Sequence, residues 1–143
     1  MQNWSCPPNL QGMTVVLYFD GVMPHTRNRW PALLRSMDGV KAIGMPDDGQ
    51  GNSDLRFVLD DYPDHTPVYV VADTAAHGAL QLDTFQHPEK ALYVFGPDHG
   101  FIAPPEGAVR VTIFMSRSDR SIFSDHAGAM VLYHRRTQRG TWT

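Results

Sequence analysis

The 143-residue chain has few cysteines, no long apolar run and no positive net charge, and each shortage excludes a class of protein. Cys6 is its single cysteine, so an internal disulfide is excluded and a reducing, cytoplasmic location is expected. No apolar run approaches the roughly 18 residues of a membrane helix, so no membrane association is expected. The net charge of −3 and the pI near 6.1 argue against nucleic-acid binding through a wholly basic domain.

Several familiar functional motifs are also missing. No Gly-x-Gly-x-x-Gly or Walker sequence follows the first apolar strand, so dinucleotide and nucleoside-triphosphate chemistry has no support. The seven histidines show no pair at a familiar ligand spacing beside a cysteine or acid cluster, so no metal site is predicted. Ser121 and Ser124 lie near His126, but neither stands in a Gly-x-Ser-x-Gly elbow, so a hydrolase is not expected.

Arginine supplies ten of the twelve cations, and most of these arginines lie near the two ends of the chain. They are Arg27, Arg29 and Arg35 in the first third and Arg110, Arg117, Arg120, Arg135, Arg136 and Arg139 in the last. The guanidinium group suits forked contacts with phosphate, so two clusters that converged would form a local anion site on a mildly acidic protein. The alternative is a set of solvated surface charges.

Short apolar runs alternate with helical patterns along the chain. Strands are expected at 13–19, 40–44, 68–72, 91–95 and 109–113, and helices at 30–37, 52–59 and 118–136, the last capped by Ser118 or Asp119. This order predicts a single α/β domain over 13–137 with a mainly parallel sheet, a flexible arm over 1–12 and a tail over 138–143. In such sheets ligands bind beyond the carboxyl ends of the strands.

The last expected helix places Ile122, His126, Ala129, Met130 and Tyr133 on one face. We expect this face to be buried in the core or in an interface between two copies of the chain. His126 would then be a core or interface histidine.

One stretch, ALYVFGPDHG over 91–100, is a buried strand that ends in a glycine- and proline-containing turn. Such a turn either stops the strand or lets a ligand approach main-chain groups. Gly96 would permit that approach. His99 in the same loop is either a base or RNA contact, or a solvent-facing side chain.

Three segments resemble the SpoU-type branch of the SPOUT superfamily, the RNA ribose 2′-O-methyltransferases, and especially its small single-domain tRNA enzymes. VVLYFDGVMPHTRNRW (15–30) looks like the family's opening strand and turn, and ALYVFGPDHG like its Phe-Gly-Pro-Glu-x-x-Gly motif. VRVTIFMSRSDRSIFSDHAGAMVLYHRR (109–136) looks like its Ile-Pro strand, Ser-x-Asn turn and final Ala-rich helix. The resemblance implies a C-terminal trefoil knot, a homodimer and S-adenosylmethionine bound in three loops.

Mapped onto this chain, the resemblance also implies site residues. The cofactor loops would contain Val71, Ala72 and Asp73 after the third strand, Phe95, Gly96, Pro97 and Asp98 after the fourth, and Thr112, Ile113 and Ser121 around the fifth. Arg29 or Arg35 would activate a ribose hydroxyl, with Asn28 and Ser121 beside it. The phosphates of RNA, expected to be a tRNA, would contact Arg27, Arg117, Arg120, Arg135 and Arg136.

The departures from the family pattern fall where activity is decided. Pro31 stands near the family's arginine, Thr112 replaces a proline and Phe123 replaces the asparagine of Ser-x-Asn. His25 and Asp98 replace an asparagine and a glutamate. Phenylalanine cannot make the hydrogen bonds of asparagine, so the site has either been rebuilt or lost catalysis. Two interpretations therefore stay open: a methyltransferase, with an accessory protein if the small domain lacks affinity for RNA, or a non-catalytic relative that binds RNA, the cofactor or a protein.

Overall fold

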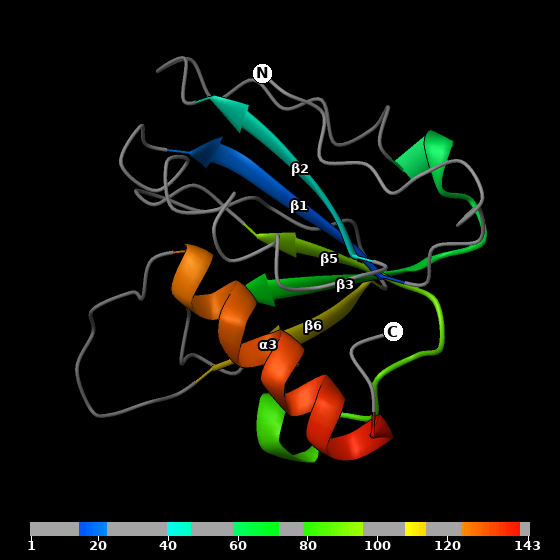
Figure 1. The fold of residues 1–143 in the computed structure, drawn as a ribbon, viewed down its shortest axis with the longest axis vertical. Helices are drawn as coiled ribbons and strands as arrows, with labels where there is room; N and C mark the ends of the chain where they lie inside the picture. The colour runs from blue at the N-terminus through cyan, green and yellow to red at the C-terminus, as the bar shows by residue number, and fades with distance from the viewer. Residues whose placement is uncertain are drawn as a thin grey trace.

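The structure, a computed structural model, describes residues 15–22, 40–46, 59–71, 79–95, 108–113 and 124–140. The strands are β1 (Val15–Val22), β2 (Val40–Pro46), β3 (Thr66–Val71), β4 (Leu80–Gln81), β5 (Ala91–Phe95) and β6 (Val109–Thr112). The helices are the short 3-10 helix η2 (Leu82–Thr84) and α3 (Ser124–Arg139), and residues 59–61 are also helical. Figure 1 shows the described strands side by side in one twisted sheet, with α3 lying across one face.

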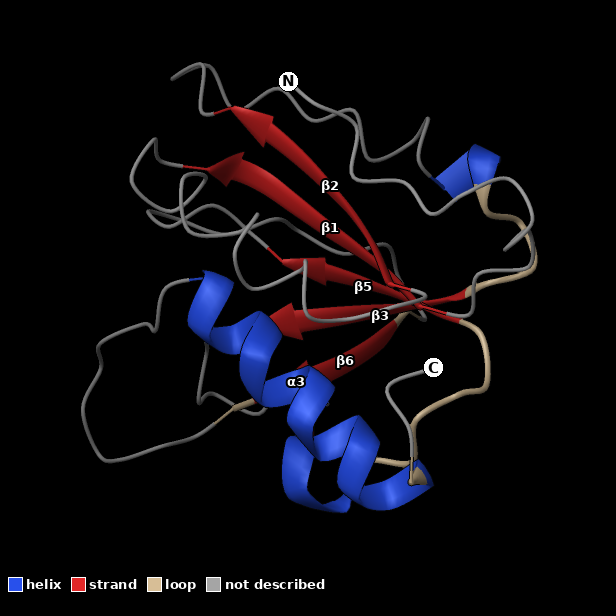
Figure 2. Ribbon diagram, in the orientation of Figure 1, coloured by secondary structure: helices blue, strands red, loops and turns tan. Residues whose placement is uncertain are grey.

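Every strand pairing in the sheet is parallel, in the order β2-β1-β5-β3-β6-β4. The predicted α/β class, the parallel sheet and all five expected strands are therefore confirmed. β4 and η2 were not predicted, because two paired residues and a single 3-10 turn leave no periodic apolar pattern. The helix and strand colouring of Figure 2 shows how α3 and η2 lie together on the same side of the sheet.

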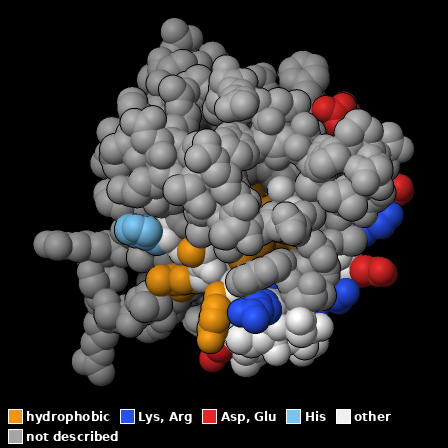
Figure 3. All heavy atoms as spheres, viewed as in Figure 1, with side chains coloured by type: hydrophobic (Ala, Val, Ile, Leu, Met, Phe, Trp, Pro, Cys, Tyr) orange, Lys and Arg blue, Asp and Glu red, His pale blue; other side chains and the backbone are white. Residues whose placement is uncertain are grey.

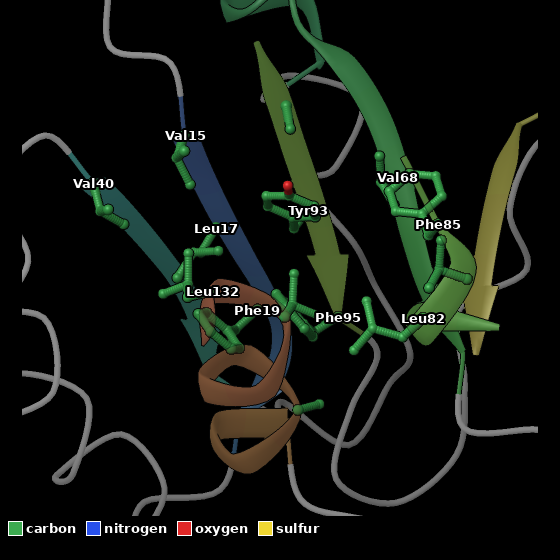
Figure 4. Close-up of a cluster of buried hydrophobic side chains, with 14 residues drawn as sticks. Val15, Leu17, Phe19, Val40, Val68, Leu82, Phe85, Tyr93, Phe95 and Leu132 are labelled. Carbon is green, nitrogen blue, oxygen red and sulfur yellow. The ribbon is translucent and has the colours of Figure 1, made fainter. Parts of the chain in front are cut away.

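The central strands are buried on both faces, as their continuous apolar runs predict. On the face that α3 covers lie Val15, Leu17 and Phe19 of β1 with Ala91, Tyr93 and Phe95 of β5, and on the other face lie Val16, Tyr18, Leu92 and Val94. Figure 4 shows Leu17 and Phe19 close to Leu132 of α3, with Tyr93 and Phe95 on the neighbouring strand β5. Complete burial of a large apolar side chain contributes about 1.5–3 kcal/mol, so these two strands fix the core of the domain.

The residues of α3 that face the core are Ala127, Val131, Leu132 and Arg135, whereas His126 is exposed and Tyr133 is 63% exposed. His126 and Tyr133 are therefore not part of the core of this chain, and their place in an interface between two copies stays a prediction. Arg135, which was expected to contact phosphate, is buried instead. Figure 3 shows apolar side chains exposed at the surface on the side of the molecule where α3 lies.

The remaining structural predictions fall partly or wholly outside the described residues. The arm over 1–12, the helix over 30–37 and the caps Ser118 and Asp119 lie outside them, as do the loops that would form the trefoil knot. α3 continues to Arg139, two residues into the predicted tail. Within the described part of the chain, no helix is both long enough and apolar enough to cross a membrane.

Candidate functional site at the carboxyl edge of the sheet

The parallel strands bring the expected cofactor positions to one edge. Phe95 ends β5 in register with Val70 of β3, and Val71 at the end of β3 is in register with Thr112 of β6. Ile113 follows β6 directly and is half-buried. Positions that are far apart in the sequence, at 71, 95 and 112, therefore lie on neighbouring strands where each strand ends.

The order in which the strands are added to the sheet also changes direction near its centre. β2, which follows β1 in the chain, lies at one end of the sheet beside β1, whereas β4, which follows β3, lies at the other end beyond β6. β5 lies between β1 and β3. Crevices of this kind, beyond the carboxyl ends of parallel strands, are where open α/β sheets bind ligands. The topology thus makes the loop that follows Phe95 the best-placed ligand loop.

Two aromatic rings form the floor of this edge. Phe19, the last residue of β1 that pairs with β5, is in register with Phe95, and their rings are stacked with centroids 4.7 Å apart and planes 12° apart. Figure 4 shows both rings under α3. Ile113 adds a half-buried apolar side chain at this edge, and Thr112 adds a buried polar one.

The other predicted site residues lie outside the described residues. These are Ala72, Asp73, Gly96, Pro97, Asp98 and Ser121 for the cofactor, Asn28, Arg29 and Arg35 for catalysis, and Arg27, Arg117 and Arg120 for RNA. Their roles remain predictions. In the described part of the chain, no group of three histidine, cysteine, aspartate or glutamate side chains could hold a metal ion.

Arg135 requires a correction, because the side chain predicted to contact phosphate is completely buried. Its Nη1 donates to the carbonyl of Pro88 at 2.7 Å and to the Tyr93 hydroxyl at 3.0 Å, and its Nη2 donates to the carbonyl of Glu89 at 2.6 Å. These donors are used inside the protein, so in this structure Arg135 fixes α3 to the segment that leads into β5. Its neighbour Arg136 is exposed, and its contact with RNA stays a prediction.

The Arg135 contacts continue into a chain of hydrogen bonds that sequence reasoning missed. Arg135 has only donors, so the Tyr93 hydroxyl accepts from it, and the same hydroxyl is hydrogen-bonded to Nδ1 of His87 at 2.7 Å. Nε2 of His87 is hydrogen-bonded to Nδ1 of His134 at 2.7 Å. Nε2 of His134 donates to the carbonyl of Asp83 at 3.3 Å.

The surroundings of His87 and Tyr93 disfavour charge on both groups. Burial, and then the positive charges of His134, Arg135 and Arg139, lower the pKa of His87 from 6.5 to about 4. Burial also raises the pKa of the Tyr93 hydroxyl, although the nearby Arg135 opposes the shift. Both groups are therefore neutral at pH 7.

Comparison with known proteins identifies the class of fold. No protein-family model and no curated protein matches the chain at the level of sequence. Among solved structures, a proposed RNA methyltransferase from Bacillus anthracis superposes with a TM-score of 0.68 at 14% identity, covering 89% of this chain and 95% of that protein. The SpoU methyltransferase AviRb from Streptomyces viridochromogenes superposes with a TM-score of 0.54 at 19% identity, covering 90% of this chain and 62% of that protein.

The chain therefore has the same fold as these two proteins. This likeness supports, at the level of the fold, the resemblance inferred from the three sequence segments. At these identities the likeness concerns architecture, and the chemistry has to be argued from the site.

Proposed function

We propose that the protein is an S-adenosylmethionine-dependent RNA ribose 2′-O-methyltransferase that acts on tRNA. The observation that carries the proposal is the meeting of Val71, Phe95 and Thr112 at the ends of three neighbouring parallel strands. That is the edge at which an α/β sheet binds ligands, and the fold is one that SpoU-type methyltransferases use. With a single cysteine and no disulfide to maintain, we expect the enzyme to act in the cytoplasm.

The residues present fit a bent nucleoside cofactor. The apolar edge above Phe19 and Phe95 would hold the adenine, with main-chain groups of the loops after Val71, Phe95 and Thr112 supplying hydrogen bonds. When bound, S-adenosylmethionine supplies an electrophilic methyl group, so the protein chiefly has to position the ribose hydroxyl for in-line attack. The cofactor-binding role of these loops is a proposal that depends on backbone geometry more than on side chains.

The catalytic and RNA-binding roles come from arginine. The guanidinium of Arg29 or Arg35 would stabilise the ribose oxygen as it loses its proton, because a nearby cation favours the anionic form. Asn28 and Ser121 would orient the same group. Phosphates would be held by Arg27, Arg117, Arg120 and the exposed Arg136.

A homodimer is part of the proposal. Tyr133 is 63% exposed on α3 and Met130 is half-buried, so the outer face of this helix offers apolar area to a second copy. We expect scattering at micromolar protein to give the mass of two chains, and a monomeric mass would contradict the dimer. An accessory protein could supply the RNA affinity that a mildly acidic domain lacks.

The alternative function is a non-catalytic relative that binds RNA, the cofactor or a protein partner. The substitutions favour it: Pro31 near the family's arginine, Phe123 for an asparagine and Thr112 for a proline. Thr112 is buried at the end of β6, so it is integrated into the sheet there.

Labelled S-adenosylmethionine and total host tRNA distinguish the two functions. We expect label in ribose with the wild-type protein and a loss of about 100-fold or more in either Arg29→Ala or Arg35→Ala, since general acid–base and electrostatic assistance of this kind contributes on that order. The other arginine variant serves as the matched control. No transfer from a protein that binds both cofactor and tRNA would leave the non-catalytic function.

A further inference from the structure

The second half of α3 is attached to one short segment of the chain, residues 83–89, which precedes β5. Gln138 donates to the carbonyl of Phe85 at 2.6 Å and accepts from the amide of His87 at 2.7 Å. Arg135 donates to two carbonyls of the same segment, at positions 88 and 89. His134 is hydrogen-bonded to the His87 ring and donates to the carbonyl at position 83. We call this set of contacts the clasp. Because they all meet on one short segment, a displacement of His87 would disturb them together.

The two histidine rings of the clasp can hold one added proton between them, but not two. Nε2 of His134 carries a hydrogen, because its acceptor is a carbonyl. The 2.7 Å contact between Nε2 of His87 and Nδ1 of His134 needs one hydrogen between the two nitrogens. With both rings neutral, or with either ring charged, one of these nitrogens donates and the other accepts, and the Tyr93 hydroxyl on the other side of His87 accepts or donates as required. With both rings charged, each nitrogen carries a hydrogen, so the bond is replaced by a contact between two cations.

The surroundings of His87 oppose the second charge. Its side chain is 6% exposed, and the ring of Phe85 lies edge-on to it at a centroid distance of 5.0 Å. The titratable and charged groups that face it are His134, Arg135 and Arg139 of α3 and the Tyr93 hydroxyl of β5. Burial and the three positive charges hold the pKa of His87 at about 4, whereas His134 is only half-buried and water can solvate its charge. A charged His87 therefore reaches water only if the clasp opens.

We propose that the His87–His134 pair is an acid-sensitive release for α3: the clasp stays closed with no added proton or with one, and the second proton opens it. Opening separates the second half of α3 from residues 83–89. The rest of the helix stays on the sheet, because its contacts there are apolar and run through Ala127 and Val131 to the core. The release depends neither on the proposed function nor on a ligand.

Hydrogen exchange measured by NMR on the full chain tests the release at the amide of His87. In the open clasp both histidines bind protons with the ordinary pKa of 6.5, whereas the closed clasp holds one proton, so opening takes up one proton. The protection of this amide, corrected for its intrinsic exchange rate, should therefore fall about tenfold between pH 5.5 and pH 4.5. No change would mean that the closed clasp holds both protons, and a fall of about 100-fold would mean that it holds none. Either result would overturn the proposal.

The hydrogen-bonded amides of β5 are the internal reference, since local opening and unfolding of the whole domain expose different sets of amides. At pH 4.5 the His87 amide should be at least about tenfold less protected than the β5 amides. Equal protection would mean that the clasp opens only when the sheet unfolds, and the release would then not exist.

Two variants separate the pair from the burial of one ring. In His87→Gln the remaining histidine protonates against a neutral amide, so protection of the amide at position 87 should not change between pH 5.5 and pH 4.5. In His134→Gln the like charge beside His87 is absent, which should raise the pKa of His87 by on the order of one unit and reduce the fall to about threefold. A full tenfold fall in His134→Gln would contradict a role for the pair. If this variant does not fold, the wild-type pH dependence still distinguishes one proton from none or two.

Discussion

At the scale of single residues, protonation of His87 makes the stability of the fold depend on pH. In the folded protein the pKa of His87 is lowered to about 4, whereas the unfolded chain has the ordinary value of 6.5. At pH values between 4 and 6.5 the unfolded chain binds a proton at this histidine and the folded chain does not. The free energy of unfolding therefore has its full value above pH 6.5 and decreases as the pH drops from 6.5 towards 4.

Between pH 7 and pH 4.5 we expect the free energy of unfolding of the wild-type protein to fall by about 2 kcal/mol more than that of His87→Gln. Urea unfolding of wild type and of His87→Gln at the two pH values measures the difference. An equal acid loss in wild type and His87→Gln would show that His87 does not titrate in this way.

Arg135 and its neighbour Arg136 should behave oppositely on substitution. Arg135→Met leaves two carbonyls and the Tyr93 hydroxyl without their donor, which should lower the free energy of unfolding by about 3 kcal/mol. Arg136→Met, on the exposed side, should change it by less than about 0.5 kcal/mol. Chemical denaturation compares the two. Equal, small effects would mean that Arg135 is the surface cation that its sequence context first indicated.

These residue-scale features could not be predicted from the sequence. His87 and His134 are 47 positions apart, and Arg135 and Tyr93 are 42 apart, so nothing local marks them as partners. The spacing of the histidines was tested only for metal ligands, and that test says nothing about hydrogen bonding between distant segments.

At the scale of elements, a glycine ends α3. Gly140 has φ of +81°, and its amide donates to the carbonyl of Arg136 at 2.7 Å, which is the left-handed cap that favours glycine. No described atom lies within 4 Å of a Cβ built there, so a substitution would be strained only in its backbone.

Gly140→Ala should therefore lower the free energy of unfolding by about 1 kcal/mol. Gly140→Asn should lower it less, because asparagine tolerates the left-handed region. Thermal melts of the two variants against wild type make the measurement. A melting temperature for the alanine variant at or above the wild-type value would rule out the cap.

The elements with strong sequence signals were predicted, and those without were not. Continuous apolar runs such as ALYVF indicated buried parallel strands, and the sheet confirms them. The core-facing side of α3 was not predicted, because hydropathy alone excludes a buried arginine such as Arg135. The interface role of the side that includes the exposed Tyr133 stays a prediction. The end of α3 was placed early, although basic residues in the last turn followed by Gly140 were a usable signal.

At the scale of the whole molecule, segment order carried more information than any motif. Alternating strands and helices predicted the parallel sheet, and the family resemblance pointed to positions 71, 95 and 112, which the sheet brings together at one edge. The substitutions at Pro31, Thr112 and Phe123 do not disturb that arrangement, since it depends on the backbone. Whether catalysis survives them is a property of side chains, which the fold does not determine.

Calorimetry with S-adenosylmethionine most directly tests the central claim, that this edge of the sheet is a cofactor site. The wild-type protein should bind one molecule per chain, and Gly96→Val should bind none, because we expect a branched side chain after Phe95 to fill the space for the cofactor. Gly140→Ala, a glycine substitution at the far end of α3, serves as the control and should bind like wild type. Absence of heat and of any thermal shift for the wild-type protein with both S-adenosylmethionine and its demethylated product would contradict the account.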